Sequence, residues 1–387
     1  MRILFILDEF LPENSGGAAN IAFGLAKELI KLGNNLLVLT ATFNPENVGE
    51  AEIEGVKIRK ILSRSFGKFR NFKNLKNRAL LKETEKVFTE YRPDVVHIHT
   101  LHHRFSYGVI GLAKKFSRAV FFTFHDAQTI YNGKLFPKDN YKISWLDNLK
   151  KDRLGYNPLQ KFFIKRALKK VNKIFAVSDA LKKALETNGI NNIETIHNGI
   201  NAQEWAPSNF QENNILFIGR VDEAKGANVL IKIFGDINNA VPEANLIIVG
   251  DENFKAENNK NIKMLPWQSD RNEVKKIFAK AKVVVTPSLY LDPFPTVNLE
   301  AMAAGKPVVG TCFGGTKEAV VNNETGYIVN PYDEKTMVEK IIDLLENKEK
   351  AAVFGKAGRE RVEKVFSLER QVQTTLIQYE NIAKKIN

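Results

Sequence analysis

The chain has 387 residues, of which 44% are hydrophobic and 26% are charged, and its formal net charge is +13. Its length exceeds the size at which one hydrophobic core usually stops growing, so we expect two domains. The single cysteine, Cys312, excludes an intramolecular disulfide and a cysteine-based zinc site, which fits a reducing cytoplasm.

The excess positive charge is confined to the first half of the chain. Residues 1–207 contain 33 Lys/Arg and 20 Asp/Glu, whereas residues 208–387 contain 24 of each. One domain is therefore expected to meet an anionic partner. No apolar stretch approaches the ~18 residues of a membrane-spanning helix, and Asp8 interrupts the first apolar run too early for a signal peptide.

Short apolar runs alternate with helical patterns, which predicts an α/β protein with parallel sheets. A buried strand is expected at 3–7, followed by a helix that ends at Gly33. A stretch without periodicity at 198–210 predicts the interdomain linker. We therefore expect domains at 1–205 and 206–366, with the terminal helix 367–387 joining the first domain. Further strands are expected at 36–40, 95–99, 120–124, 173–177, 193–196, 215–218, 245–249, 282–286, 307–309 and 326–329.

Two basic residues, Arg220 and Lys225, follow the expected strand at 215–218. Arginine supplies a planar fork and lysine a point charge, so the two could clamp a diphosphate at this strand end. The alternative is an ordinary solvated basic loop.

Two carboxylates, Asp292 and Glu300, follow the strand at 282–286 with seven residues between them. We predict a helix from Thr296 to Ala304, closed by Gly305, whose first amides would suit a phosphate. The two carboxylates could hold sugar and ribose hydroxyls through charge-assisted hydrogen bonds. Taken singly, each such acid is more often a helix cap or a surface charge.

This stretch resembles the Glu-x7-Glu signature of the retaining glycosyltransferases of family 4. The resemblance implies the GT-B fold, with two Rossmann-like domains whose parallel sheets face each other across a central cleft. It covers nearly the whole chain and is weakest in residues 42–90 and 126–160. Further motifs occur in the family's order: Gly16-Gly17, His125-Asp126, Val177-Ser178, His197-Asn-Gly-Ile200, Val249-Gly-Asp251, Gly314-Gly315 and Glu318.

The resemblance also implies roles for individual residues. Arg220 and Lys225, beside Gly219, would bind the donor diphosphate and stabilise the charge that grows on it. His125 would lie over the transferred sugar near the reacting carbon. The remaining donor-binding residues would be Gly16 and Gly17 for close approach, Asp292 for sugar hydroxyls, Glu300 for the ribose, and the amides near Phe294, Thr296 and Val297 for the distal phosphate or sugar.

The sequence departs from the family pattern at three positions. Asp292 stands where glutamate is usual, Pro295 replaces a common glycine and removes an N–H donor, and Asn34 replaces a histidine. Outside the family context, a histidine at this position is more often a satisfied loop residue than a functional one. The spacing of His97 and His99 is interpreted as placing their side chains on opposite strand faces, which argues against a shared metal.

Residues 57–86 contain 11 Lys/Arg and only two acids. Within this segment Phe66, Phe69, Phe72 and Leu75 recur at every third position. This pattern predicts an amphipathic helix that binds an anionic membrane surface, although the aromatic residues could instead face the core. We expect a cytoplasmic protein, attached peripherally to the inner face of the plasma membrane if this helix docks.

The leading hypothesis is retaining transfer of a sugar from a UDP-, GDP- or ADP-sugar to a glycan or lipid-linked acceptor. No Asp-x-Asp pair occurs in the sequence, so we expect no metal and no cofactor. The alternatives are a sugar-nucleotide epimerase or phosphorylase on the same fold, and a non-catalytic donor-binding subunit. Nucleic-acid binding is disfavoured, because it would leave the paired acids and the Arg220/Lys225 clamp unexplained.

Overall fold

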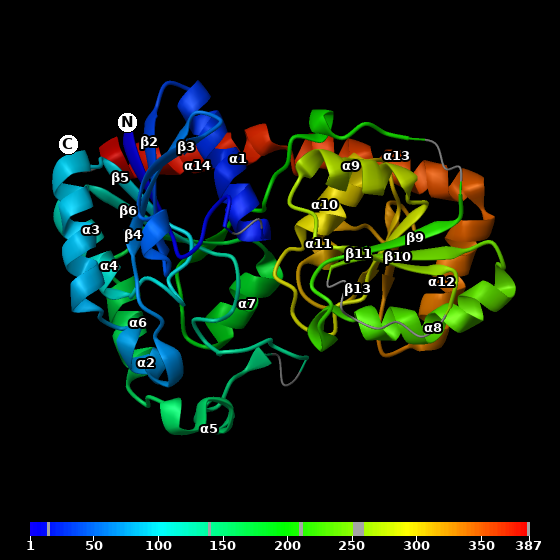
Figure 1. The fold of residues 1–387 in the computed structure, drawn as a ribbon, viewed down its shortest axis with the longest axis horizontal. Helices are drawn as coiled ribbons and strands as arrows, with labels where there is room; N and C mark the ends of the chain where they lie inside the picture. Colours follow the sequence, from blue (N-terminus) through cyan, green and yellow to red (C-terminus); the bar gives the residue numbers. More distant parts are fainter. Residues whose placement is uncertain (14–15, 138–140, 209–211, 251–258, 385–387) are drawn as a thin grey trace. The chain divides into compact units, whose positions relative to one another are not determined.

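The computed structural model describes residues 1–13, 16–137, 141–208, 212–250 and 259–384 (Figure 1). Two compact units are present, one formed by Met1–His197 with Glu369–Asn387 and the other by Asn198–Leu368. Each unit contains its own mainly parallel sheet with intervening helices, which confirms the expected α/β class. Within the described part of the chain, no helix is long and apolar enough to cross a bilayer.

The sheet of the first unit has the strand order β3-β4-β2-β1-β5-β6-β7-β8. Strand β1 pairs in parallel with β2 on one side and β5 on the other, so the direction of strand addition reverses beside β1. Residues 3–7 of β1 are all buried, as expected of a strand covered by helices on both faces. The strands are β1 (Arg2–Leu7), β2 (Asn35–Thr42), β3 (Gly49–Ile53), β4 (Val56–Leu62), β5 (Val95–Ile98), β6 (Ala119–Phe124), β7 (Lys173–Ala176) and β8 (Ile193–Thr195).

The helices of the first unit bury one apolar stripe against this sheet. In the first of them, Ile21, Leu25 and Leu29 recur at helical spacing and are buried. Gly33, with φ of 80°, then allows the chain to leave the helix, as expected from the sequence. The helices are α1 (Gly17–Lys31), α2 (Arg70–Lys73), α3 (Arg78–Tyr91), α4 (Gly108–Phe116), α5 (Trp145–Asp152), α6 (Gln160–Leu168) and α7 (Asp179–Thr187).

The sheet of the second unit is parallel, with the order β11-β10-β9-β12-β13-β14. Its order reverses between β9 and β12, which is where ligands of such sheets bind. The strands are β9 (Asn214–Ile218), β10 (Asn245–Gly250), β11 (Ile262–Pro266), β12 (Val283–Thr286), β13 (Val308–Thr311) and β14 (Gly326–Val329). The helices are α8 (Ala227–Ala240), α9 (Arg271–Lys280), α10 (Thr296–Ala303), α11 (Thr316–Ala319), α12 (Glu334–Glu346) and α13 (Lys348–Val365).

The last helix, α14 (Leu368–Lys384), packs against the sheet of the first unit. Its Tyr379 is fully buried, and the phenol group hydrogen-bonds Nδ1 of His97 on β5. The Tyr379 ring also lies 4.8 Å from the ring of Phe121 on β6, measured between centroids. A polar contact and an aromatic contact therefore fix the helix to the sheet.

The amphipathic helix expected from the pattern at Phe66, Phe69, Phe72 and Leu75, within the basic segment 57–86, does not form as one helix. Residues 56–62 form β4, in which the buried Val56 and Ile58 alternate with the exposed Lys57, a period of two rather than of 3.6. A 3₁₀ turn at Gly67–Phe69 and the short α2 follow, and Asn77 then caps a separate helix, α3. Of the aromatic residues, Phe66 faces the core and is buried, whereas Phe69 and Phe72 are exposed and available to a membrane surface.

Two glycines of α13 allow this helix to approach α10 closely. A Cβ atom on Gly355 would lie 2.0 Å from the carbonyl oxygen of Gly305, which follows α10. A Cβ atom on Gly358 would lie 3.2 Å from the side chain of Met302, which is fully buried in α10. The position of α10, which carries Glu300, thus depends on the absence of side chains at positions 355 and 358 of α13.

We expect Gly355→Ala to lower the free energy of unfolding by roughly 1–3 kcal/mol, because the added methyl group overlaps a backbone oxygen. The matched control is Gly235→Ala in α8, where a Cβ atom meets nothing within 4 Å. This change should stabilise by about 0.5–1 kcal/mol through helix propensity. Thermal and urea unfolding measure both effects, and equal stability of the two variants would contradict the packing argument.

Candidate functional site

Lys225 and Asp292 are brought together at the carboxyl ends of β9 and β12. Lys225 Nζ donates a 2.6 Å hydrogen bond to Oδ2 of Asp292, and Ser288 Oγ donates to the same oxygen at 3.0 Å. Asp292 is buried and Lys225 is partly exposed. Because the strand order reverses between β9 and β12, this pair occupies the expected ligand-binding edge of the sheet.

Two glycines hold the loops that carry this pair. Gly226 has φ of 76°, and a Cβ atom there would lie 2.1 Å from the carbonyl oxygen of Pro287. Gly314 has φ of 69°, and a Cβ atom there would lie 2.1 Å from the carbonyl oxygen of Asp292. Both positions therefore need glycine for backbone conformation and for space.

The surroundings of Lys225 keep its amine charged. Burial acts to lower the pKa of Lys225, but the neighbouring carboxylate of Asp292 and the phenol of Tyr290 outweigh it, so this pKa lies above its ordinary value. Burial, reinforced by Asp292, raises the pKa of Tyr290. Lys225 Nζ also lies 5.8 Å from the centre of the Tyr290 ring. A fixed ammonium group is thus present across the physiological pH range.

Gly219 and Arg220 follow β9 directly. The Arg220 side chain is 63% exposed, and its Nε lies 3.7 Å from Oδ2 of Asp222. Arg220 is close enough to Lys225 for its charge to oppose protonation of that lysine. The loop therefore offers two cations: the ammonium group of Lys225, which Asp292 holds in place, and the solvent-exposed guanidinium group of Arg220.

The helix α10 begins immediately after the Asp292 loop. Pro295 is its N-cap residue and makes no side-chain cap hydrogen bond, so the first-turn amides at Thr296 and Val297 are not satisfied by a cap. The predicted start at Thr296 and the stop at Gly305 agree with the structure. Phe294 is buried before the helix, with its ring centroid 5.5 Å from that of Phe366.

Glu300 lies on α10 and is paired with a residue that the sequence analysis did not single out. Arg271 Nη1 donates a 2.9 Å hydrogen bond to Glu300 Oε1, and the guanidinium also lies over the ring of Trp205. Glu300 is buried, whereas the Arg271 side chain is 41% exposed. The sequence carries no signal for this contact, because Arg271 begins a different helix, α9, 29 residues away.

In the first unit, Gly16 and Gly17 begin α1 after β1. Gly16 is the N-cap residue, and its carbonyl oxygen accepts from the amide of Asn20 at 3.1 Å. Gly17 is exposed at the first helical position. The helix has no side-chain cap, so a glycine-lined amino terminus lies where the strand order reverses beside β1.

His125 follows β6, and its Nε2 lies 3.0 Å from Nδ1 of His99 in a hydrogen bond. Burial lowers the pKa of His125 to about 4, with Asp126 acting in the opposite direction. Burial also lowers the pKa of His97 to about 3 and that of His99 well below the ordinary value. All three rings are therefore neutral at pH 7.

The expectation that His97 and His99 lie on opposite strand faces is wrong. Residues two apart in a strand share a face, and the two rings stack with their centroids 4.2 Å apart. His97 is hydrogen-bonded through both nitrogens, to Tyr379 and to Thr123. The histidines form a buried row rather than separate surface groups.

Asp126 is held by its own set of partners. Its Oδ1 lies 3.2 Å from Nε2 of the buried His102 and accepts a 2.8 Å hydrogen bond from the amide of Gln128. Burial acts to raise the pKa of Asp126, but His102 and this amide lower it below its ordinary value. Conversely, burial acts to lower the pKa of His102, and Asp126 raises it. Asp126 and His102 thus favour each other's charged forms, next to the neutral His125.

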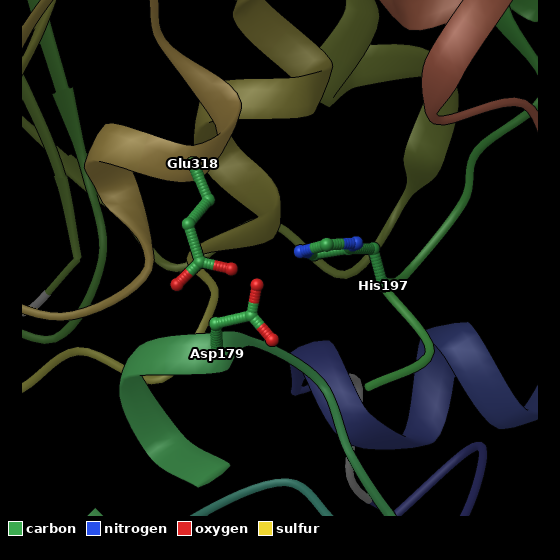
Figure 2. Close-up of side chains that lie close together, drawn as sticks. All are labelled: Asp179, His197 and Glu318. Atoms are coloured by element: carbon green, nitrogen blue, oxygen red, sulfur yellow. The ribbon is translucent and has the colours of Figure 1, made fainter. Parts of the chain in front are cut away.

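Figure 2 labels three further residues: Asp179 and His197 of the first unit, and Glu318 of the second. Asp179 is the first residue of α7 and accepts a hydrogen bond from Thr195 Oγ1. His197 follows β8. The Glu318 side chain extends from α11 in the second unit, and the Glu318 carbonyl oxygen accepts from Arg361 at 2.9 Å. Asp251, which also belongs to a matched motif, lies outside the described residues.

Comparisons with known proteins match both halves of the chain. Residues 15–204 match the family model described as Glycosyltransferase Family 4, and residues 201–361 match Glycosyl transferases group 1. A sucrose-phosphate synthase structure from Thermosynechococcus elongatus superposes with a TM-score of 0.75 at 19% identity, covering 99% of each chain. This similarity concerns the fold.

Two curated relatives align over part of their length. An uncharacterized glycosyltransferase of Methanocaldococcus jannaschii is 31% identical over 58% of this chain. Spore coat protein SA of Bacillus subtilis is 29% identical over 43% of this chain. The aligned regions span 63% and 48% of the lengths of these two relatives.

We expect His125→Asn to make stability less dependent on pH between about 4 and 6.5. In this window His125 is protonated in the unfolded chain but not in the folded chain. The contribution of His125 to the free energy of unfolding is therefore complete above its unfolded-state pKa and is lost as the pH falls toward 4. Asparagine does not titrate. Urea unfolding of both proteins across this window tests the sign, and parallel pH profiles would contradict a buried neutral His125.

Proposed function

Because the chain belongs to the family 4 glycosyltransferases, we propose that it transfers a sugar from a nucleoside-diphosphate sugar to an acceptor hydroxyl with retention of anomeric configuration. The donor is a UDP-, GDP- or ADP-sugar, bound by the second unit. The acceptor is bound by the first unit, and the reaction needs no metal ion.

One observation carries this proposal: Lys225 and two uncapped helix starts lie at the reversal of strand order in the second sheet. Neither α8, whose N-cap residue is Gly226, nor α10, whose N-cap residue is Pro295, has a side-chain cap. In the same unit, α9, α12 and α13 are all capped by Asp or Asn side chains. Uncapped amides beside a fixed ammonium group suit a diphosphate.

In the proposed reaction, the bond between the anomeric carbon and the diphosphate oxygen breaks while the acceptor oxygen bonds to that carbon. The acceptor proton passes to the departing diphosphate, so no protein nucleophile is needed. Lys225 and Arg220 stabilise the charge that grows on the leaving group. Asp292 and Glu300 hold hydroxyls of the transferred sugar and of the ribose.

The remaining roles concern the amino-terminal turn of α10 and the first unit. Phe294, Thr296 and Val297 offer backbone groups to the distal phosphate or sugar. His125 contacts the transferred sugar as a neutral ring, in keeping with its lowered pKa. Gly16 and Gly17 allow close backbone approach, which fits their position at the uncapped start of α1.

We further propose that the acceptor is a glycan or a lipid-linked glycan presented at the cytoplasmic face of a membrane. Two observations support a membrane contact through part of residues 57–86. Phe69 and Phe72 are exposed, and the neighbouring Lys73 and Lys76 are exposed as well. The whole net charge of +13 also lies in residues 1–207.

The alternative of a pyridoxal-dependent phosphorylase requires an available lysine. Burial lowers the pKa of Lys306 to about 8, which makes it the most plausible amine on chemical grounds. Its ammonium group, however, donates to Ser208 O, Ser208 Oγ and Ala279 O. These contacts favour a structural role for Lys306.

We expect one of UDP, GDP and ADP to raise the melting temperature, and Lys225→Ala to abolish the rise. At a ligand concentration of ~100 Kd the rise should be roughly 5 °C or more. The matched control is Lys232→Ala, because Lys232 is exposed on α8 and paired with Glu334. No shift with any nucleotide on folded protein, or an equal shift in Lys225→Ala, would overturn the donor site.

With the nucleotide identified, we expect the product to keep the anomeric configuration of the donor sugar, as read from the anomeric proton coupling by NMR. Asp292→Asn should reduce kcat/KM by roughly 10²-fold, because a charge-assisted contact to the sugar is lost and Lys225 loses its partner. Inversion would rule out the proposed mechanism. Hydrolysis or transfer at wild-type rate in Asp292→Asn would remove Asp292 from the site.

A further inference from the structure

Residues 145–163 of the first unit expose seven large apolar side chains. Leu154 is 96% exposed, and Trp145 and Phe162 are each 61% exposed. The core-facing positions of α6, Ile164 and Leu168, are buried, so the exposed residues are additional to the core. We call the set the α5–α6 surface; its members are Trp145, Leu146, Leu149, Leu154, Leu159, Phe162 and Phe163.

The short helix α2 and the 3₁₀ turn before it add Phe72 and Phe69, respectively, to this surface. Buried Asn71 of α2 donates hydrogen bonds to Oδ2 of Asp152 at 2.7 Å and to Gly155 O at 3.1 Å. Asn157 Nδ2 in turn donates to Asn71 O at 2.9 Å. These bonds fix α2 beside the turn that carries Leu154, and Figure 1 shows α2, α5 and α6 at the same end of the unit.

The surroundings of the surface are strongly basic. Residues 142–170 contain nine Lys/Arg and two acids, Asp147 and Asp152. Both acids are engaged within the protein, since Asp147 closes the capping box of α5 and Asp152 accepts from Asn71. The lysines and arginines, by contrast, are mostly exposed, among them Lys150, Lys151, Arg153 and Arg166.

Exposed aromatic and leucine side chains that are interspersed with exposed lysine and arginine have the chemistry of a membrane-interface element. The apolar groups can enter the headgroup region while the cations meet anionic lipid. We propose that the α5–α6 surface, with Phe72 of α2 and Phe69 of the turn before it, binds the surface of a bilayer that contains anionic lipid. This inference deepens the membrane part of the proposed function and rests on it for the lipid-linked acceptor.

The proposal changes the docking element expected from the sequence. Only Phe69 and Phe72 of this surface belong to residues 57–86. Its other seven apolar residues lie at 145–163, a segment that the sequence pattern did not connect with membranes. Charge complementarity favours an anionic lipid surface over a second copy of this chain, because two copies of so basic a surface would repel each other. A second copy remains an outcome of the test.

The first experiment uses the fluorescence of Trp145 on full-length protein. Of the three tryptophans, Trp205 is buried, so Trp267→Phe leaves Trp145 as the exposed reporter. Vesicles of phosphatidylcholine with phosphatidylglycerol should shift its emission to shorter wavelength and carry the protein upward in a flotation gradient. Vesicles of phosphatidylcholine alone should bind at least about tenfold more weakly. No shift and no flotation with either vesicle would overturn the proposal.

Variants then separate the apolar from the charged contribution. Leu154→Ser with Phe162→Ser should weaken vesicle binding at least about tenfold, because two inserted side chains are lost. Lys150→Gln with Lys151→Gln should weaken binding roughly tenfold or more on anionic vesicles only. The control is Leu32→Ser with Ile377→Ser, which removes two exposed residues elsewhere in the unit. Equal binding by the control and the Leu154/Phe162 variant would overturn the assignment.

Two further readouts distinguish other outcomes. All surface variants should keep the nucleotide-induced rise in melting temperature, which ties any loss of vesicle binding to the surface and not to unfolding. If the protein binds vesicles but no nucleotide, the membrane-binding role of the α5–α6 surface is supported and only the proposed glycosyltransferase activity is overturned. Sedimentation in the absence of lipid tests for a dimer. A dimer that Leu154→Ser dissociates would overturn the bilayer proposal and identify a second copy of the chain as the partner of the α5–α6 surface.

Discussion

The second unit depends on close contact between backbone segments that only glycine permits. Gly226 lies against Pro287, and Gly314 lies against the backbone of Asp292. These two contacts join the loops that follow β9, β12 and β13, and thereby place Lys225 Nζ within 2.6 Å of the Asp292 carboxylate. The charged pair is a consequence of backbone packing, so its geometry does not rely on flexible side chains finding each other.

Local signals made much of the fold predictable. Central strands such as β1, β9 and β12 contain short continuous apolar runs, and α10 is bounded by Thr296 and Gly305 as its sequence indicates. The strand β4 was not among the expected strands, because lysine and arginine interrupt its apolar residues and hide the period of two. The order of strands within each sheet, and thus the reversal beside β1 and between β9 and β12, is a tertiary property that no single segment encodes.

The candidate site was predictable to a different degree. Ordered motifs singled out Lys225 and Asp292, because strand ends of a parallel sheet converge at one edge. The pairing of Arg271 with Glu300 could not be read in this way, since it depends on how α9 packs beside α10. The row formed by His97, His99 and His125 depends likewise on strand register, in which β5 lies beside β6. Motif spacing identifies residues, whereas their partners come from packing.

The contact between Lys225 and Asp292 also bears on how a donor would be accommodated. An ammonium group has three N–H donors, so Lys225 can keep its bond to Asp292 while it binds a phosphate oxygen. The buried carboxylate in turn keeps the lysine protonated, which is the state that a diphosphate requires. Without Asp292, burial would act on Lys225 unopposed by its main partner and would lower its pKa. In the proposed donor site, Asp292 would therefore contribute to phosphate binding through Lys225, in addition to its contact with the sugar.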